Sequence, residues 1–218
     1  MDDFSSARLA MVDSQIRTSG VTDRRLIAAL CNVARERFVS PGRISVAYLD
    51  DLQPLDGQKP GRFLLPPATF ARLVQLAKIS PGERVLDIGV GTGYSAAVLA
   101  GMGAKVVGVE DDELLAKQAR ENLDSLDLRE IEIVWGGYEA IDGSEFDAIL
   151  LEGAIDAVPQ ELLAKLALNG RLVAPILSRG VARAHIYTRN ASGVIFASDF
   201  DASVPRLWGH AKPQEFVF

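Results

Sequence analysis

An acidic residue followed by three alternate glycines is the part of the sequence whose residue types best suit ligand binding. The group comprises Asp87, Gly89, Gly91, Gly93 and the adjoining Tyr94. Glycine lets the chain turn tightly and lets a ligand approach the backbone. The apolar run before the group predicts a strand, and the residues after it predict a helix. Since α/β sheets bind ligands outside the carboxyl ends of their strands, we expect a binding site at this turn.

The order of these residues separates two kinds of nucleotide ligand. The dinucleotide pattern G-x-G-x-x-G aims a helix N-terminus at a pyrophosphate. Here the third glycine comes one position early, and Tyr94 stands where that pattern needs glycine. The acid Asp87 would suit a cationic group. S-adenosylmethionine carries an ammonium and a sulfonium but no phosphate, and acid-x-Gly-x-Gly-x-Gly is typical of the methyltransferases that use it. We therefore predict S-adenosylmethionine as the cofactor.

Four more positions complete the predicted cofactor site. Glu110 ends the next predicted strand, where a carboxylate can accept hydrogen bonds from both ribose hydroxyls. Asp111 follows directly and is included in the same site. Gly137 and Tyr138 follow the third predicted strand and by position should lie beside the adenine. The alternatives are a solvated acid at a strand end for Glu110, and an ordinary turn with an aromatic in the core for residues 135–138.

The elements that must position these residues follow from the alternation along the chain. Strands are expected at 85–88, 106–110, 131–134, 146–151 and 170–175, with helices at 94–100, 112–125 and 158–167. This order predicts a Rossmann-like class I methyltransferase fold of the α/β class, with a mostly parallel sheet and helices on both faces. Two more strand-like runs, 183–188 and 193–199, should form an antiparallel C-terminal hairpin at the edge.

The first 78 residues are expected to form a helical region with a substrate loop. Helices are predicted within residues 5–40, with Gly20 ending the first and Thr22 capping the second. Residues 41–67 are rich in proline and glycine and should be irregular, and loops this long are often functional. A further helix runs from about Thr69 to 80–82. We expect one methyltransferase domain over 1–218, divided into this 1–78 region and a cofactor-binding core at 79–218.

Composition limits the class of protein and its partners. Of 218 residues 48% are hydrophobic, which is enough for a sizeable core. A net charge of −6 without a basic stretch argues against nucleic acid and membrane surfaces as partners. One cysteine, no signal pattern and no apolar run of roughly 18 residues indicate a cytoplasmic protein. No metal site is predicted, and His185 and His210 should be structural or surface residues.

Longer stretches resemble a single family. Seven of them are similar to the protein-L-isoaspartate O-methyltransferases: residues 11–17, 20–23, 33–39, 47–50, 84–94, 146–149 and 170–175. The resemblance implies that S-adenosylmethionine is used for carboxyl methylation of L-isoaspartyl residues in damaged proteins and peptides, which starts their repair. That acceptor has a pKa near ~4 and is ionised at pH 7, so no general base is needed. Positioning against the sulfonium methyl and exclusion of water would suffice, and we name no catalytic residue.

The chain departs from the family on the substrate side. The family loop reads Gly-Gln-Thr-Ile-Ser-Gln-Pro, whereas residues 61–67 read Gly-Arg-Phe-Leu-Leu-Pro-Pro. The family serine falls on Leu65 and the threonine on Phe63, so two hydroxyls become apolar; Leu64 lies between them. Arg62 either supplies the lost carboxylate contact by a charge-assisted bond or is a solvated loop arginine.

Two further departures lie elsewhere in the expected site. The family has Gly-Asp-Gly after the third strand, and this chain has Gly136-Gly137 without the acid. Glu152 stands where the family usually has a small or neutral residue. It could repel an anionic acceptor, serve as base for a neutral one, or be an exposed loop acid.

Three functions are compatible with these residues, in descending order of preference. The first is isoaspartyl carboxyl methylation with a remodelled loop. The second is methylation of another acceptor, such as an apolar small molecule lined by Phe63, Leu64 and Leu65. The third is a non-catalytic relative that binds the cofactor. A methylation assay on isoaspartyl peptide separates the first from the others, and the oligomeric state is left open.

Overall fold

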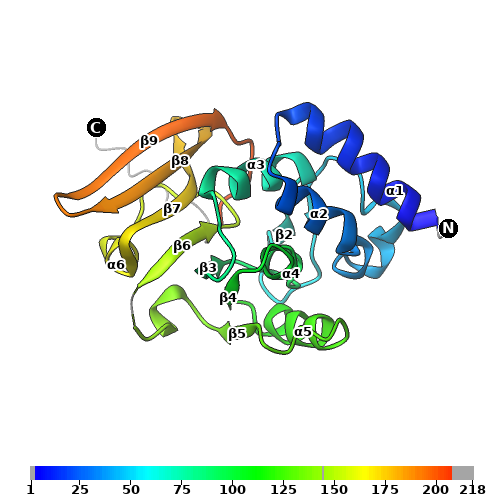
Figure 1. The fold of residues 1–218 in the computed structure, drawn as a ribbon. Helices are drawn as coiled ribbons and strands as arrows, with labels where there is room; N and C mark the ends of the chain where they lie inside the picture. The colour runs from blue at the N-terminus through cyan, green and yellow to red at the C-terminus, as the bar shows by residue number, and fades with distance from the viewer. Residues whose placement is uncertain (1–2, 144, 208–218) are drawn as a thin grey trace, which may run out of the picture.

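The computed structural model describes residues 3–143 and 145–207, and its centre is a sheet of seven strands (Figure 1). In chain order these strands are β3 (Arg84–Ile88), β4 (Lys105–Glu110), β5 (Glu132–Trp135), β6 (Phe146–Leu151), β7 (Leu166–Ser178), β8 (Val181–Asn190) and β9 (Gly193–Asp201). Their order across the sheet is β5-β4-β3-β6-β7-β8-β9. The first five are parallel, and β8 and β9 continue from β7 as antiparallel strands. The predicted sheet and its antiparallel edge hairpin are confirmed.

The order of the strands fixes where a ligand can bind. The chain runs outward from β3 to β4 and β5 on one side, then returns to β6 and β7 on the other. The topological switch point therefore lies between β3 and β6, where such sheets form a crevice at the carboxyl ends of the strands. The first residues beyond those ends are the glycine turn after β3 and Glu152 after β6.

Helices cover both faces of the sheet. They are α3 (Pro67–Ala77), α4 (Tyr94–Gly101), α5 (Glu113–Asp124) and α6 (Gln160–Ala164). Neighbouring strand residues point to opposite faces. Val85 thus packs into the larger core with α3, α4 and α5, whereas Leu86 packs into the smaller core with α6. The helix predicted at 158–167 is too long, because Leu166 already pairs with Phe146 as the first residue of β7.

The N-terminal region is built from short helices. They are α1 (Asp3–Met11), continued by a π-helix (Val12–Ile16) and a 3₁₀ turn (Arg17–Ser19), then α2 (Arg24–Asn32) and two 3₁₀ segments (Arg35–Arg37 and Pro41–Val46). Figure 1 shows α1 and α2 on the side of the molecule away from the β8–β9 hairpin. Gly20 ends the first stretch with a φ of +85°. The prediction that Thr22 caps the second helix is wrong by one residue. The cap of α2 is Asp23, whose side chain accepts hydrogen bonds from the backbone N–H groups of Arg25 and Leu26.

Between its 3₁₀ segment (Pro41–Val46) and α3, the proline-rich segment is irregular apart from one small antiparallel pair of strands, β1 (Gln53–Pro54) and β2 (Phe63–Leu64). No long helix forms there, as predicted. Residues from the N-terminal helices and from the sheet share the larger core, as Leu26 and Val85 illustrate. The division of the chain at 78/79 stays a prediction. Within residues 3–143 and 145–207, no helix is both long and apolar enough to cross a membrane.

Candidate cofactor and substrate site

The glycine turn joins β3 to α4 and has a backbone that other residues adopt poorly. Gly89 and Gly91 have φ values of +84° and +54°. A Cβ added at Gly89 would lie 2.4 Å from Leu207 Cδ1, and one added at Gly91 would lie 2.7 Å from Leu55 Cδ1. Since real Cβ atoms do not approach so closely, the turn requires glycine for space as well as for conformation.

Asp87 is the last residue but one of β3, and it is a buried acid without its full set of hydrogen bonds. Its side chain is completely buried, and among the described residues neither carboxylate oxygen has a hydrogen-bond partner. Burial raises the pKa of Asp87 to about 7, against which the nearby Ser95 hydroxyl acts. A buried carboxylate with free acceptors suits a cationic ligand group, because an unpaired charge is costly to bury. The residue therefore fits the ammonium of S-adenosylmethionine.

Glu152 lies beside Asp87 at the carboxyl end of the neighbouring strand. Its backbone N–H donates to Ile88 O at 3.0 Å, which extends the β3–β6 pairing by one residue. The side chain is 7% exposed, so the alternative of an exposed loop acid is wrong. Burial and the neighbouring Asp87 carboxylate raise the pKa of Glu152 well above its usual value. The two acids thus form a buried pair in which one carboxyl group is readily protonated.

Glu110 ends β4 and is also completely buried, so the alternative of a solvated acid is wrong. Its carboxylate accepts from Gly91 N at 2.7 Å and from Asp112 N at 3.0 Å. Burial raises its pKa although Arg62 opposes the shift. Glu110 is thus bonded directly to the glycine turn, and its carboxylate is a hydrogen-bond acceptor at the carboxyl end of β4, as the ribose role requires.

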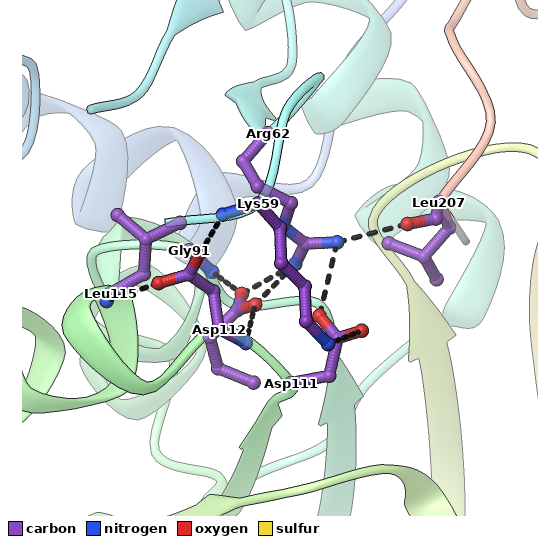
Figure 2. A network of polar contacts seen from close by, with 8 residues as sticks. Lys59, Arg62, Gly91, Asp111, Asp112, Leu115 and Leu207 are labelled. Atoms are coloured by element: carbon purple, nitrogen blue, oxygen red, sulfur yellow. Dashed lines mark hydrogen bonds and ion pairs between the residues drawn. The ribbon is translucent and has the colours of Figure 1, made fainter. Parts of the chain in front are cut away.

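Arg62 reaches from the β1–β2 loop to Glu110 at the end of β4. Figure 2 labels Arg62 with its other partners, Leu207 and Asp111. Arg62 Nη2 lies 2.6 and 2.5 Å from the two Glu110 oxygens, and its Nη1 donates to Leu207 O at 2.9 Å. A longer ion pair of 3.6 Å joins Nη1 to Asp111. The side chain is 8% exposed, so the alternative of a solvated loop arginine is wrong. The sequence did not indicate this partner.

The predicted adenine side is open. Asp111, Gly137 and Tyr138 line one cavity of about 670 Å³, together with Lys59 and residues 154–157. Lys59 Nζ lies 2.8 Å from Asp111 Oδ2 at the rim. Trp135, which precedes this turn, is 53% exposed rather than part of the core. The three predicted residues are therefore brought together, on one side of Glu110.

The predicted substrate side is nearly closed. Leu64 and Leu65 are buried and Phe63 is half-buried. These three residues and Glu152 line a cavity of only about 10 Å³, which is room for about one water molecule.

Arg35 lines the same small cavity and was not singled out from the sequence as a functional residue. It is fully buried and donates to Ala47 O at 2.9 Å and to Leu65 O at 2.7 Å. Its guanidinium lies 4.8 Å from the centre of the Tyr94 ring. The only sequence signal was its place in the stretch 33–39, which resembles the family.

The described part of the C-terminal tail folds over the site. Leu207 N–H donates to Ala154 O at 2.9 Å, and Ala154 N–H donates to Pro205 O at 2.8 Å. The Leu207 side chain is 5% exposed and packs on Gly89. His185 lies on β8, while His210 lies outside the described residues. No cluster of metal-ligating side chains occurs in the described part of the chain.

A glycine turn with one buried acid on its own strand and a second at the end of the following strand fits an S-adenosylmethionine-dependent methyltransferase, and the matches given next show that the chain is an enzyme of this class. The sequence model described as "Protein-L-isoaspartate(D-aspartate) O-methyltransferase (PCMT)" matches residues 7–203. The chain belongs to this family.

Similar proteins agree in sequence and fold. A protein-L-isoaspartate O-methyltransferase from Gloeobacter violaceus is 38% identical over 208 residues, covering 94% of this chain and all of that protein. One from Geobacter metallireducens is 39% identical over 177 residues, covering 79% and 80%.

Two solved structures share the fold. A putative protein-L-isoaspartate O-methyltransferase from Plasmodium falciparum, in complex with S-adenosyl-L-homocysteine, has a TM-score of 0.78 at 22% identity and covers 95% of this chain and 99% of that one. Another protein-L-isoaspartate O-methyltransferase has a TM-score of 0.81 at 24% identity, covering 93% of this chain. This chain spans 66% of that structure's length. At these identities the likeness shows the fold.

Proposed function

We propose that the protein transfers a methyl group to the free α-carboxylate of L-isoaspartyl residues in proteins and peptides, as a first step in their repair; the side-chain carboxyl of such a residue forms its peptide bond. The observation that carries this proposal is the family match over residues 7–203, with a relative 38% identical over its whole length. The alternatives of another acceptor and of a non-catalytic relative are not favoured by these comparisons.

The buried acids suggest how the cofactor is held. We assign Asp87 to the ammonium of the amino-acid part, and Glu110 to the ribose hydroxyls. Asp111, Gly137 and Tyr138 line the open cavity and would flank the adenine. The glycines give the turn its close approach to the ligand. Bound S-adenosylmethionine supplies an electrophilic methyl group on its sulfonium.

The protein's part in the reaction is then positioning and exclusion of water. An isoaspartyl carboxylate is ionised at neutral pH and needs no base. The apolar residues Phe63, Leu64 and Leu65 would shield the reacting atoms, since water competes with an anionic nucleophile for its charge. Two buried cations stand near this segment, Arg35 and Arg62, and either could offset the charge of the acceptor. No residue is assigned as a general acid or base.

The remaining parts of the proposal concern partners and location. We expect isoaspartyl-containing proteins and peptides as partners, without nucleic acid or membrane, and the net charge of −6 supports this. We keep a cytoplasmic location as part of the proposal. Its support is the single cysteine, Cys31, which is free.

The test is methyl transfer from labelled S-adenosylmethionine to an isoaspartyl peptide, with the aspartyl isomer of the same peptide as the control. Transfer to the isoaspartyl peptide alone is expected. Calorimetry with S-adenosylhomocysteine accompanies the assay, and Asp87→Asn should bind it much more weakly. Tight cofactor binding without transfer to the peptide would contradict the assigned acceptor, while leaving the class of enzyme intact.

A further inference from the structure

The carboxylate of Glu110 has no acceptor capacity left in this structure. Two ionised oxygens offer about four lone-pair sites. Backbone N–H groups of Gly91 and Asp112 use one site on each oxygen. Arg62 Nη2 lies within 2.6 Å of both oxygens and takes the remainder. Hydrogen bonds from the two ribose hydroxyls to this carboxylate therefore require Arg62 to leave.

The space above the glycine turn is also filled by the protein itself. The Leu207 side chain occupies the position over Gly89, and Arg62 Nη2 would lie 3.6 Å from a Cβ there. Leu55 occupies the corresponding position over Gly91. The amino-acid and ribose parts of the cofactor site are thus covered, whereas the cavity beside Tyr138 is open.

One arginine holds this cover together. Arg62 joins three segments that are distant in sequence: its own loop, the end of β4 at Glu110, and the tail at Leu207 (Figure 2). Its backbone carbonyl also accepts from Leu55 N–H at 2.9 Å, which ties the side chain over Gly91 to the same loop. Displacing the guanidinium therefore removes the side-chain contact that joins this loop to the tail at Leu207 and to the end of β4 at Glu110.

We propose that Arg62, Glu110 and Leu207 form a latch that closes the cofactor site, and that S-adenosylmethionine binds only when Arg62 has left Glu110. The latch rests on the proposed role of Glu110 as the ribose acceptor. The described conformation is then the closed state of the enzyme. The measured association constant for the cofactor equals that of the open form multiplied by the fraction of molecules that are open.

The first test is the affinity of the free protein for S-adenosylhomocysteine, measured by calorimetry in Arg62→Ala. If the open form is about a tenth of the population, removing the latch should tighten binding about tenfold. Arg183→Ala is the matched control, because it removes an arginine from an exposed ion pair with Asp201 on the edge hairpin. It should leave the affinity within about twofold. Unchanged or weaker binding in Arg62→Ala would overturn the latch.

A second variant covers the case in which Arg62→Ala fails to fold, since it leaves Glu110 buried without its cation. Leu207→Ala keeps the ion pair and opens the space over Gly89. It should also bind S-adenosylhomocysteine more tightly than the parent. Unchanged or weaker binding would contradict the proposal that Leu207 covers the cofactor site. Thermal unfolding of both variants shows whether they are folded at the temperature of the titration.

A third variant separates the latch from the role of Glu110 on which it rests. In the Arg62→Ala background the latch is already open, so the added change Glu110→Gln reports only the ribose contact. A loss of affinity in the double variant supports Glu110 as the ribose acceptor. If affinity is retained there, that assignment fails. If Arg62→Ala binds more weakly than the parent, and the added Glu110→Gln weakens binding further, the assignment of Glu110 stands and the latch fails.

Discussion

The two loops that meet at the cofactor site are held in place by different means. Loop 89–93 takes its shape from its own residues, as the positive φ of Gly89 shows. Residues 57–65 are held instead by side chains from elsewhere, among them Arg35, which donates to Leu65 O. A loop shaped by its own residues can be predicted from local sequence, whereas one held by distant partners cannot.

The difference also separates a rigid surface from a movable one. The glycine turn is continuous with β3 and α4, both of which lie in the core. The loop at 57–65 is attached at a few points, including the 2.5 Å hydrogen bond from Lys59 N–H to Asp112. Elements with few attachments open at a lower free energy than core strands do. Leu64 and Leu65 belong to that core as well, so we expect movement on ligand binding in the residues before them, 57–62.

The largest expected effect comes from breaking the anchor of that loop. Arg35→Met keeps most of the side-chain volume but leaves the buried carbonyls of Ala47 and Leu65 without their donor. We expect unfolding free energy to fall by about 2–3 kcal/mol, because each unpaired group costs about 1–3 kcal/mol and loss of the buried charge offsets part of this. Urea unfolding measures the change. Arg43→Met, whose arginine donates to the Gln53 side chain, is the control, and an equal loss in both would remove the special role of Arg35.

The next effect tests the other loop. Gly89→Ala should cost about 1–2 kcal/mol for a φ of +84° and more for the contact with Leu207. Gly180→Ala is a close match, since its φ is +83° and nothing lies within 4 Å of the added Cβ. The difference between the two variants in thermal or urea unfolding isolates the contact with Leu207. Equal losses of unfolding free energy in the two variants would mean that Leu207 moves away from the added methyl group at no cost.

The contrast between the two loops shows which features of the structure could be predicted from the sequence. The strand predicted at 146–151 has those bounds in the structure, Glu110 ends its strand as predicted, and Asp87 lies one residue before the predicted and observed end at 88. Local apolar runs and strand ends carry this information. The partner of Arg62 could not be predicted, since 48 residues separate it from Glu110. The burial of Glu152 was likewise missed because it depends on β3–β6 pairing and on packing from several elements.

A pH dependence of cofactor binding would sharpen the assignment of Asp87. With a pKa of about 7, Asp87 is largely protonated at pH 6 and ionised at pH 8. Since a cationic ligand favours the ionised form, S-adenosylhomocysteine affinity should rise up to about tenfold per pH unit below 7 and level off above it. Glu152→Gln keeps a donor beside Asp87 and should retain the rise. Affinity that is constant between pH 5.5 and 8 would contradict the ammonium contact.

The same acid makes a separate prediction for the free protein. A carboxyl group whose folded pKa is raised binds more protons in the folded state than in the unfolded state. The preferential protonation of folded Asp87 therefore stabilises the protein most below the unfolded pKa. This stabilisation is lost as the pH rises from about 4 to about 7. Asp87→Asn should flatten that part of the stability profile in urea unfolding. A parent profile with no such decline would show that Asp87 is ionised throughout.

The smallest effect concerns coupling between the two ligands. When a cofactor takes Glu110, Arg62 is released into the loop that faces the acceptor, and a free cation there favours an anionic peptide. S-adenosylhomocysteine should then raise the affinity for an isoaspartyl peptide about fivefold, and the peptide should raise the affinity for S-adenosylhomocysteine equally. Arg62→Ala should abolish this coupling while binding S-adenosylhomocysteine more tightly. Coupling that persists in Arg62→Ala would place the acceptor contact elsewhere, and Arg35, a buried cation that donates to Leu65 O of that loop, would be the next candidate.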